Sequence, residues 1–316
     1  MGCSRTARTA DILAAVMDET LAILKDIGHP EYGSARSKRT YSDHVKIGLL
    51  VIRQFVGGSY EDFIRFLPSI GGVLKVAGMR NIPDPSTLWK FAGRLDHDVL
   101  ENVLQRLAKT CCSEDMIIAV DSTGFSLRNI SRHMEKRVKE FGVRSEIKRD
   151  FVKTTFSVDT RSLMILSCDC VDSRNADVKR MEHAITSLMR GGFSVGCVVA
   201  DKGYDAEYVH RDIHERLGAE AFIPIRNMSE PARSGSSKIR TSGFHRGRMK
   251  FFFDKVRYNQ RSKVETVNSM VKRKMGDVVN SRIPATSGAE VILRAIAHNF
   301  RRLLELKPES MEGMIS

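Results

Sequence analysis

Residues 258–274 read YNQRSKVETVNSMVKRK. If this stretch is one helix, with about 100° of rotation per residue, four polar side chains fall within an arc of roughly 60°. These side chains are Tyr258, Arg261, Glu265 and Lys272. An apolar set falls on a different arc, which would pack against a core and turn the polar face toward a cleft. The members of this set are Val264, Val267, Val271 and Met275.

This polar face combines a carboxylate with an aromatic hydroxyl, a guanidinium and an ammonium group. An enzyme that acts on a polyanion with the help of a metal ion needs such groups, because the acid binds the cation and the basic groups bind phosphates. The alternative is a surface helix with ordinary charge pairs.

The composition indicates a soluble protein. The chain has 316 residues, enough for one large domain or two ordinary ones with a real core. It is 42% hydrophobic, and it contains no apolar run near the roughly 20 residues that a membrane span requires. Residues 1–10 are polar and basic and lack the apolar region of a signal peptide. We therefore expect a cytoplasmic protein.

The charge balance is compatible with a nucleic-acid partner. Lysine and arginine number 51 against 38 acids, which gives a formal net charge of +13. A basic chain also fits other soluble proteins, so charge alone decides nothing. Six cysteines show no pair of CxxC motifs, so we expect reduced structural thiols rather than a zinc site. They are Cys3, Cys111, Cys112, Cys168, Cys170 and Cys197.

Two short apolar runs each end in an aspartate. Residues 116–120 precede Asp121, and residues 194–200 precede Asp201. Continuous apolar runs of this length are typical of strands buried on both faces. An acid at the end of such a strand points into the cleft where open α/β sheets bind ligands. The alternative for Asp121 is a side chain that caps a turn.

The first third of the chain reads as helical, with helices predicted over 11–27, 43–56 and 60–67. Asp84 and Pro85 then predict the start of a short helix that carries Trp89, Lys90 and Arg94. This helix is either the recognition helix of a helix-turn-helix unit or part of a plain bundle that buries Trp89.

Further elements are predicted after residue 150. They are a hairpin over 151–158 and 163–171, helices over 175–188 and 206–217, a strand over 221–225, and a helix over 288–306 opened by a capping box of Ser287 and Glu290. We expect residues 128–149 to be a solvated basic excursion. Residues 226–257 hold nine basic residues against two acids, a net charge of +7, and either contact DNA or form a solvated loop. We expect Phe251, Phe252 and Phe253 to pack this segment onto the core.

The spacing Tyr258-x2-Arg261-x3-Glu265-x6-Lys272 resembles the signature of DDE transposases in the group related to insertion sequences four and five. The sequence ADKGYD at residues 200–205 looks like the second-acid motif of that family. The resemblance implies a ribonuclease H-like α/β catalytic domain over 114–308, with a basic insertion at about 226–257. It also implies a mostly helical, helix-turn-helix-like DNA-binding domain over 1–113, and it leaves a tail over 309–316.

The resemblance also implies the chemistry. Asp121, Asp201 and Glu265 would be the catalytic acids and would bind two Mg²⁺ ions, for which Mn²⁺ can substitute, with Asp121 bridging both. The DNA-binding residues would be Tyr258, Arg261, Lys272 and Lys202. The partners would be double-stranded DNA, as terminal inverted repeats and as target, with the protein a homodimer or larger on DNA, nucleoid-associated and away from membranes.

The expected activity is cleavage at the ends of an insertion sequence, followed by attack of the freed 3′-hydroxyl on target DNA. Two alternatives stay open. A nuclease or resolvase on the same fold would use the same acids and stop at hydrolysis. An inactive, domesticated DNA-binding protein would keep the basic surfaces without needing all three acids.

Overall fold

A computed structural model describes residues 2–33, 38–127, 151–172, 176–226, 243–281 and 284–307. The chain divides into two compact units. The helical unit comprises residues 1–107, 126–150 and 273–316, and the sheet unit comprises residues 108–125 and 151–272. The predicted excursion over 128–149, residues 227–242 of the basic insertion and the predicted tail lie outside the described residues.

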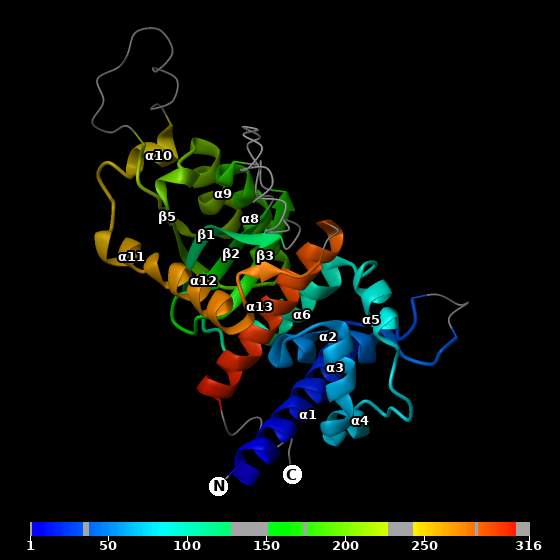
Figure 1. Cartoon of the computed structure of the whole chain (residues 1–316). Coiled ribbons are helices and arrows are strands. Elements are labelled where there is room, and N and C mark those ends of the chain that lie inside the picture. Colours follow the sequence, from blue (N-terminus) through cyan, green and yellow to red (C-terminus); the bar gives the residue numbers. More distant parts are fainter. Residues whose placement is uncertain are drawn as a thin grey trace, which may run out of the picture. The chain divides into compact units, whose positions relative to one another are not determined.

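The helical unit is built from helices (Figure 1), and apolar side chains of these helices are buried. Helix α1 packs against α2 and α4, and α2 also packs against α13. The C-terminal helix thus groups with the N-terminal helices. The helices are α1 (Gly2–Asp26), α2 (Asp43–Val56), α3 (Tyr60–Phe66), α4 (Gly71–Val76), α5 (Pro85–Ala92), α6 (His97–Lys109, whose last two residues lie in the sheet unit) and α13 (Pro284–Leu306). A 3-10 turn, η1 (Leu67–Ser69), follows α3.

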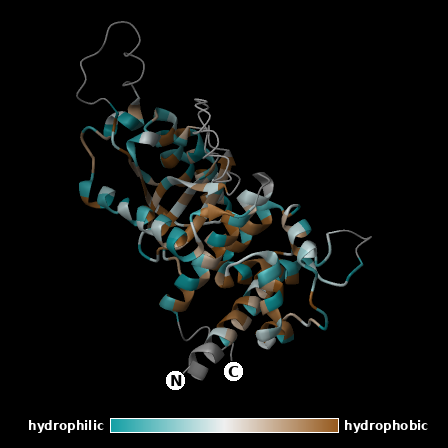
Figure 2. Cartoon of the chain, viewed as in Figure 1, coloured by the Kyte–Doolittle hydropathy of each residue, from teal (hydrophilic) through white to brown (hydrophobic). Residues whose placement is uncertain are grey.

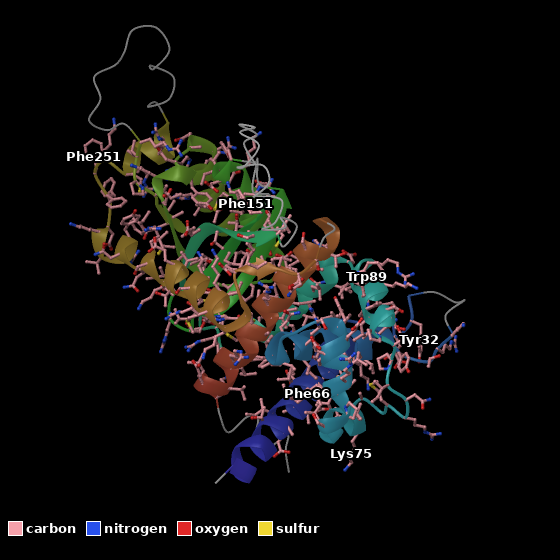
Figure 3. All side chains as sticks on the ribbon, viewed as in Figure 1. Tyr32, Phe66, Lys75, Trp89, Phe151 and Phe251 are labelled. Atoms are coloured by element: carbon pink, nitrogen blue, oxygen red, sulfur yellow. The ribbon has the colours of Figure 1, made fainter. Side chains whose placement is uncertain are left out.

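Local capping explains where these helices begin and end. Ser42 caps α2, and Gly57 follows its end with φ 80°, a conformation that glycine adopts without strain. Asp84 caps α5 through a hydrogen bond from the Ser86 N–H at 2.8 Å. The helices predicted over 43–56 and 60–67 and after Asp84 are confirmed, and α1 starts earlier than predicted. Trp89 is 48% exposed (Figure 3), so its burial in a plain bundle is wrong.

The sheet unit holds strands in the order β3-β2-β1-β4-β5. Their bounds are β1 (Met116–Leu127), β2 (Phe151–Asp159), β3 (Ile165–Asp172), β4 (Val195–Ala200) and β5 (Glu220–Phe222). The predicted hairpin is confirmed as the antiparallel pair β2 and β3, while β4 pairs in parallel with β1 and β5. The apolar runs of β1 and β4 are buried, and hydrophobic residues gather on these strands (Figure 2).

Short helices connect and cover these strands. Helix α8 packs against β2 and β3, α9 packs against α8 and β5, and α11 packs against β4. The bounds are η2 (Asp177–Arg180), α8 (Met181–Arg190), η3 (Lys202–Tyr204), α9 (Glu207–Leu217), α10 (Phe244–Arg248), α11 (Lys255–Asn259) and α12 (Ser262–Met275, whose last three residues lie in the helical unit). The predicted helices over 175–188 and 206–217 are thus present with shifted starts, and β5 is shorter than its prediction.

The strand that carries Asp121 is longer than predicted. Strand β1 does not end at Asp121 but continues to Leu127. Its last two residues, Ser126 and Leu127, pair with the short strand β6 (Val278–Val279). The local sequence gave no sign of this pairing because the partner lies about 150 residues later in the chain.

The predicted helix over 258–274 is two helices. Helix α11 ends at Asn259, a turn contains Gln260 and Arg261, and α12 begins at Ser262. Tyr258 therefore does not share a helix face with Glu265. In addition, Phe251 is 81% exposed and Phe252 is 68% exposed, so their predicted packing onto the core is wrong (Figure 3 labels Phe251).

The predicted capping box at the start of α13 is also wrong. Helix α13 begins at Pro284, which places Ser287 inside the helix, and the Glu290 carboxylate accepts hydrogen bonds from the N–H groups of Asn280 and Ser281. Glu290 also pairs with Arg294 at 2.7 Å, and both side chains are buried. Arg294 therefore belongs to the core of the helical unit and does not add to the basic surface of α13. In the described part of the chain, no helix is long and apolar enough to cross a membrane.

We predict that Glu290→Ala destabilises the helical unit by about 3 kcal/mol, because it leaves the buried Arg294 guanidinium without its carboxylate. Glu305→Ala, which removes the exposed acid that pairs with Arg302, should cost less than about 1 kcal/mol. The measurement is urea unfolding followed by the fluorescence of Trp89, the only tryptophan in the chain. Equal losses in the two variants would contradict a structural role for the buried pair.

Candidate active site

Helix α12 lies along β1, and two contacts fix this arrangement. The Asn268 amide donates a hydrogen bond to Oδ2 of Asp121 at 3.5 Å, and the Lys272 ammonium donates to Oγ1 of Thr123 at 2.6 Å. Asp121 and Thr123 share one face of the strand because side chains alternate along it. Ser122, between them, instead contacts the hydroxyls of Thr155 and Tyr204, each at 2.8 Å.

The spacings of helix and strand match. Two residues along a strand cover about 6.7 Å. Four residues along a helix, from Asn268 to Lys272, cover about 6 Å. The two contacts can therefore form together without bending either element. Glu265 precedes Asn268 by three residues, which places it on the same side of α12.

Asp121 interacts electrostatically with several charged side chains of this region. Burial raises its pKa, the neighbouring Glu265 and Asp201 raise it further, and a backbone hydrogen bond from Ser122 and the charge of Arg261 oppose the rise. The result is a pKa of about 6. Burial is therefore the main reason that the charge of Asp121 is destabilised, and both of the other predicted acids add to the effect.

The second acid, Asp201, is placed by the parallel pairing of β1 and β4. Val120 pairs with Ala200, so Asp121 and Asp201 follow paired residues on adjacent strands. Asp201 also caps η3, because its carboxylate accepts a hydrogen bond from the Gly203 N–H. Lys202 is exposed, and its backbone carbonyl accepts a hydrogen bond from the Arg226 guanidinium at 2.6 Å.

The third acid, Glu265, lies in the first turn of α12. Its side chain is 53% exposed and pairs with the Arg261 guanidinium at 2.5 Å. Burial lowers the pKa of Arg261, but the hydrogen bond and charge of Glu265 outweigh it, and the pKa rises. Tyr258, one helix earlier, packs its ring 5.1 Å from that of Phe253 and interacts electrostatically with Arg261.

These three acids suit a hard divalent cation in chemistry and in charge, because carboxylate oxygens are the ligands that Mg²⁺ prefers. Burial, the main cause of the raised pKa of Asp121, makes its ionised form costly, and a bound cation would offset that cost. Within the described ranges, however, no three acidic, histidine or cysteine side chains stand ready as a coordination group. Two of the acids have partners from the chain itself: Glu265 pairs with Arg261, and Asp201 accepts a hydrogen bond from the Gly203 N–H.

A second charged centre, which the sequence analysis did not predict, supports the loop after β4. The Asp205 side chain is fully buried and binds the Arg246 guanidinium, with Nε–Oδ1 at 2.6 Å. It also accepts a hydrogen bond from the Arg226 N–H at 2.7 Å, and His210 lies 3.5 Å away. Burial raises the pKa of Asp205, but these partners lower it to about 2. The only sequence signal was its place in the ADKGYD motif.

Residues 113–300 match the family model described as "Transposase DDE domain". A protein of Aquifex aeolicus (strain VF5), itself uncharacterized, is 21% identical over 308 residues, covering 96% of this chain and 90% of that protein. Among solved structures, a piggyBac transposase synaptic complex with hairpin DNA is similar at a TM-score of 0.40 and 12% identity, covering 96% of this chain and 76% of that one. A structural likeness of that size carries no argument about function.

We predict that Asp205→Asn destabilises the sheet unit by about 2–4 kcal/mol at pH 7, because it removes the charge that Arg246 and the loop bind. The pKa of Asp205 is lowered, so its contribution is complete above the ordinary pKa of aspartate and is lost as the pH falls toward 2. The measurement is thermal unfolding of both proteins between pH 7 and pH 2. The stability difference should shrink below about pH 4, and a constant difference would refute the charge account.

Proposed function

Because the chain belongs to the family of transposase DDE domains, we propose that it is the transposase of an insertion sequence that binds the element's ends and catalyses metal-dependent cleavage and strand transfer. The observation that carries this proposal is electrostatic: Asp121 interacts with Asp201 and Glu265, which lie on two other elements. A partly buried carboxylate with two further acids acting on it would suit a divalent-metal site.

The strand arrangement supports a ribonuclease H-like catalytic fold. The antiparallel hairpin of β2 and β3 is followed in the chain by β4 and β5. Strand β4 runs parallel to both β1 and β5. The order strand, hairpin, helix, strand, helix, strand and later helix is the one expected of that fold. Asp121 lies on the central strand and Asp201 directly after the neighbouring strand.

Cleavage of a phosphodiester needs an activated water or hydroxyl, and it needs stabilisation of the charge on the phosphate and on the leaving 3′-oxygen. Divalent cations supply these effects when they are bound. In this chain Asp121, Asp201 and Glu265 would hold them. Asn268 would orient the Asp121 carboxylate through its amide, and it is a residue that the sequence analysis missed.

The basic groups near these acids would bind DNA. Arg261 is now paired with Glu265, so engagement of Glu265 by a cation would release its guanidinium for a phosphate. Lys272 already fixes α12 to Thr123, two residues beyond Asp121, and would bring its ammonium close to the scissile phosphate. Tyr258 and the exposed Lys202 would contact DNA further out, and α5, which presents Trp89, would read the element's ends.

The test is an incubation of the purified chain with DNA that carries the gene's own flanking sequences, with Mg²⁺ or with EDTA. Strand joining that requires both Mg²⁺ and Glu265 is the expected result. Metal-dependent nicking without joining would favour the nuclease or resolvase. Binding without cleavage under every condition would favour an inactive DNA-binding protein.

We predict that Asp121→Ala, Asp201→Ala and Glu265→Gln each abolish cleavage while leaving DNA affinity largely unchanged, because each removes a metal ligand and no phosphate contact. A matched control is Glu215→Gln on α9, which alters another exposed glutamate of the sheet unit and should cleave normally. Cleavage in gel assays and affinity by fluorescence anisotropy separate the two effects. Retained cleavage in one acid variant would remove that residue from the site.

We also predict an effect of metal on stability that does not depend on activity. Because the pKa of Asp121 is raised to about 6, its ionisation opposes folding as the pH rises through 6. Asp121→Asn should therefore unfold less readily than wild type in EDTA at pH 7.5, by about 1–2 kcal/mol given the partial exposure of the side chain. Mg²⁺ should raise the melting temperature of the wild type and not that of the variant. Equal responses to Mg²⁺ would place its binding elsewhere.

A further inference from the structure

The helical unit contains a pocket of about 140 Å³ that the proposed active site does not use. It lies at the C-terminal end of α2, where residues 274–280 and α13 complete its wall. Three charged side chains form its buried floor: Arg53, Glu290 and Arg294. Gly57, Gly58 and Lys274 are exposed and form its rim.

The floor holds two guanidinium groups and a single carboxylate. Arg53 is only 4% exposed, and it stacks over the Tyr60 ring at 4.1 Å. Its Nη2 donates a hydrogen bond to the Gly58 carbonyl at 3.0 Å, while its Nε has no hydrogen-bond partner among the described residues. Burial raises the pKa of Glu290, but the charges of Arg294 and Arg53 lower it, and the carboxylate pairs with Arg294 at 2.7 Å.

The pocket is positively charged even when the partial negative charges of two helix C-termini are included. Arg53, Arg294 and Lys274 are positive and Glu290 is negative, which leaves a side-chain charge of +2. Helices α2 and α12 both end at the pocket, and each C-terminus contributes roughly half a negative charge. A net charge of about +1 is left, which matches one singly charged anion. A buried donor without a partner in a positive pocket is costly unless a ligand or water satisfies it.

The size and opening of the pocket suit a phosphate group. A volume of about 140 Å³ is large enough for a ligand of several heavy atoms, such as one phosphate group. The exposed rim gives access from solvent. At Gly57 the φ angle is 80°, and the space where a Cβ atom would stand is open, so the backbone leaves room at the mouth of the pocket.

We propose that this pocket of the helical unit binds one phosphate group, held by Arg53 on its floor and by Lys274 at its rim. The Arg294 guanidinium, which donates to Glu290 and to the carbonyls of Gly276 and Val278, adds its positive charge. The phosphate group belongs either to a free phosphate anion or to a phosphodiester of the DNA backbone. Binding of the free anion does not depend on the function proposed above, so either proposal can fail without the other.

The first test is thermal unfolding of the full chain with inorganic phosphate, compared with sodium chloride at equal ionic strength. Wild type should gain about 3 °C near ten times the dissociation constant. Arg53→Gln should lose this gain, and Lys274→Ala should reduce it. Lys75→Ala is the matched control, because it removes an exposed positive charge from α4 of the same unit, away from the pocket (Figure 3).

Phosphate also stabilises proteins by being excluded from their surface, so the comparison of Lys274→Ala with Lys75→Ala decides the outcome. Equal gains in these two variants would overturn the proposal, even if Arg53→Gln fails to fold. A short DNA duplex then identifies the source. If the phosphate is that of DNA, Lys274→Ala weakens duplex binding and reduces the slope of log affinity against log salt concentration by about one. Inorganic phosphate then also competes with the duplex. If the ligand is the free anion, duplex binding is the same in Lys274→Ala and Lys75→Ala.

Discussion

The candidate site depends on how α12 is held against β1. Asn268 and Lys272 contact Asp121 and Thr123, and this pairing works because a helix advances nearly as far in four residues as a strand does in two. The apolar side of α12, with Val264, Val267 and Val271, is buried, so the polar side must face the strand and the solvent. Without this docking, Glu265 would be one more exposed acid on a surface helix.

Two aspartates of the sheet unit show opposite electrostatic situations. Asp205 is fully buried but surrounded by Arg246, a backbone N–H and His210, so its charge is stabilised where it lies. Asp121 is partly buried beside two other acids, so its charge is destabilised. The first arrangement is that of a structural support for the loop after β4. The second, a carboxylate whose ionised form is costly where it lies, is common at functional sites.

Most of the elements that carry the acids could be predicted from short-range patterns. The apolar runs before Asp121 and Asp201 identified two strands, and parallel pairing places the aspartates on adjacent strands. What the sequence could not show depends on distant partners. Strand β1 extends past Asp121 because of β6, and Glu290 serves Arg294 and residues 280–281 rather than a helix start. The break at Gln260 and Arg261 was missed because neither residue is a helix breaker, so helical periodicity alone continues through it.

The alternation of faces along β1 limits how this part of the gene can change. Asp121 and Thr123 face α12, while Ser122 faces the hydroxyls of Thr155 and Tyr204. Inserting or deleting one residue before them would turn all three to the wrong side at once. Related sequences should therefore differ here by substitutions, and length changes should collect in the connections between strands. An alignment of relatives that shows no gaps from residue 116 to residue 123 would be the mark of this constraint.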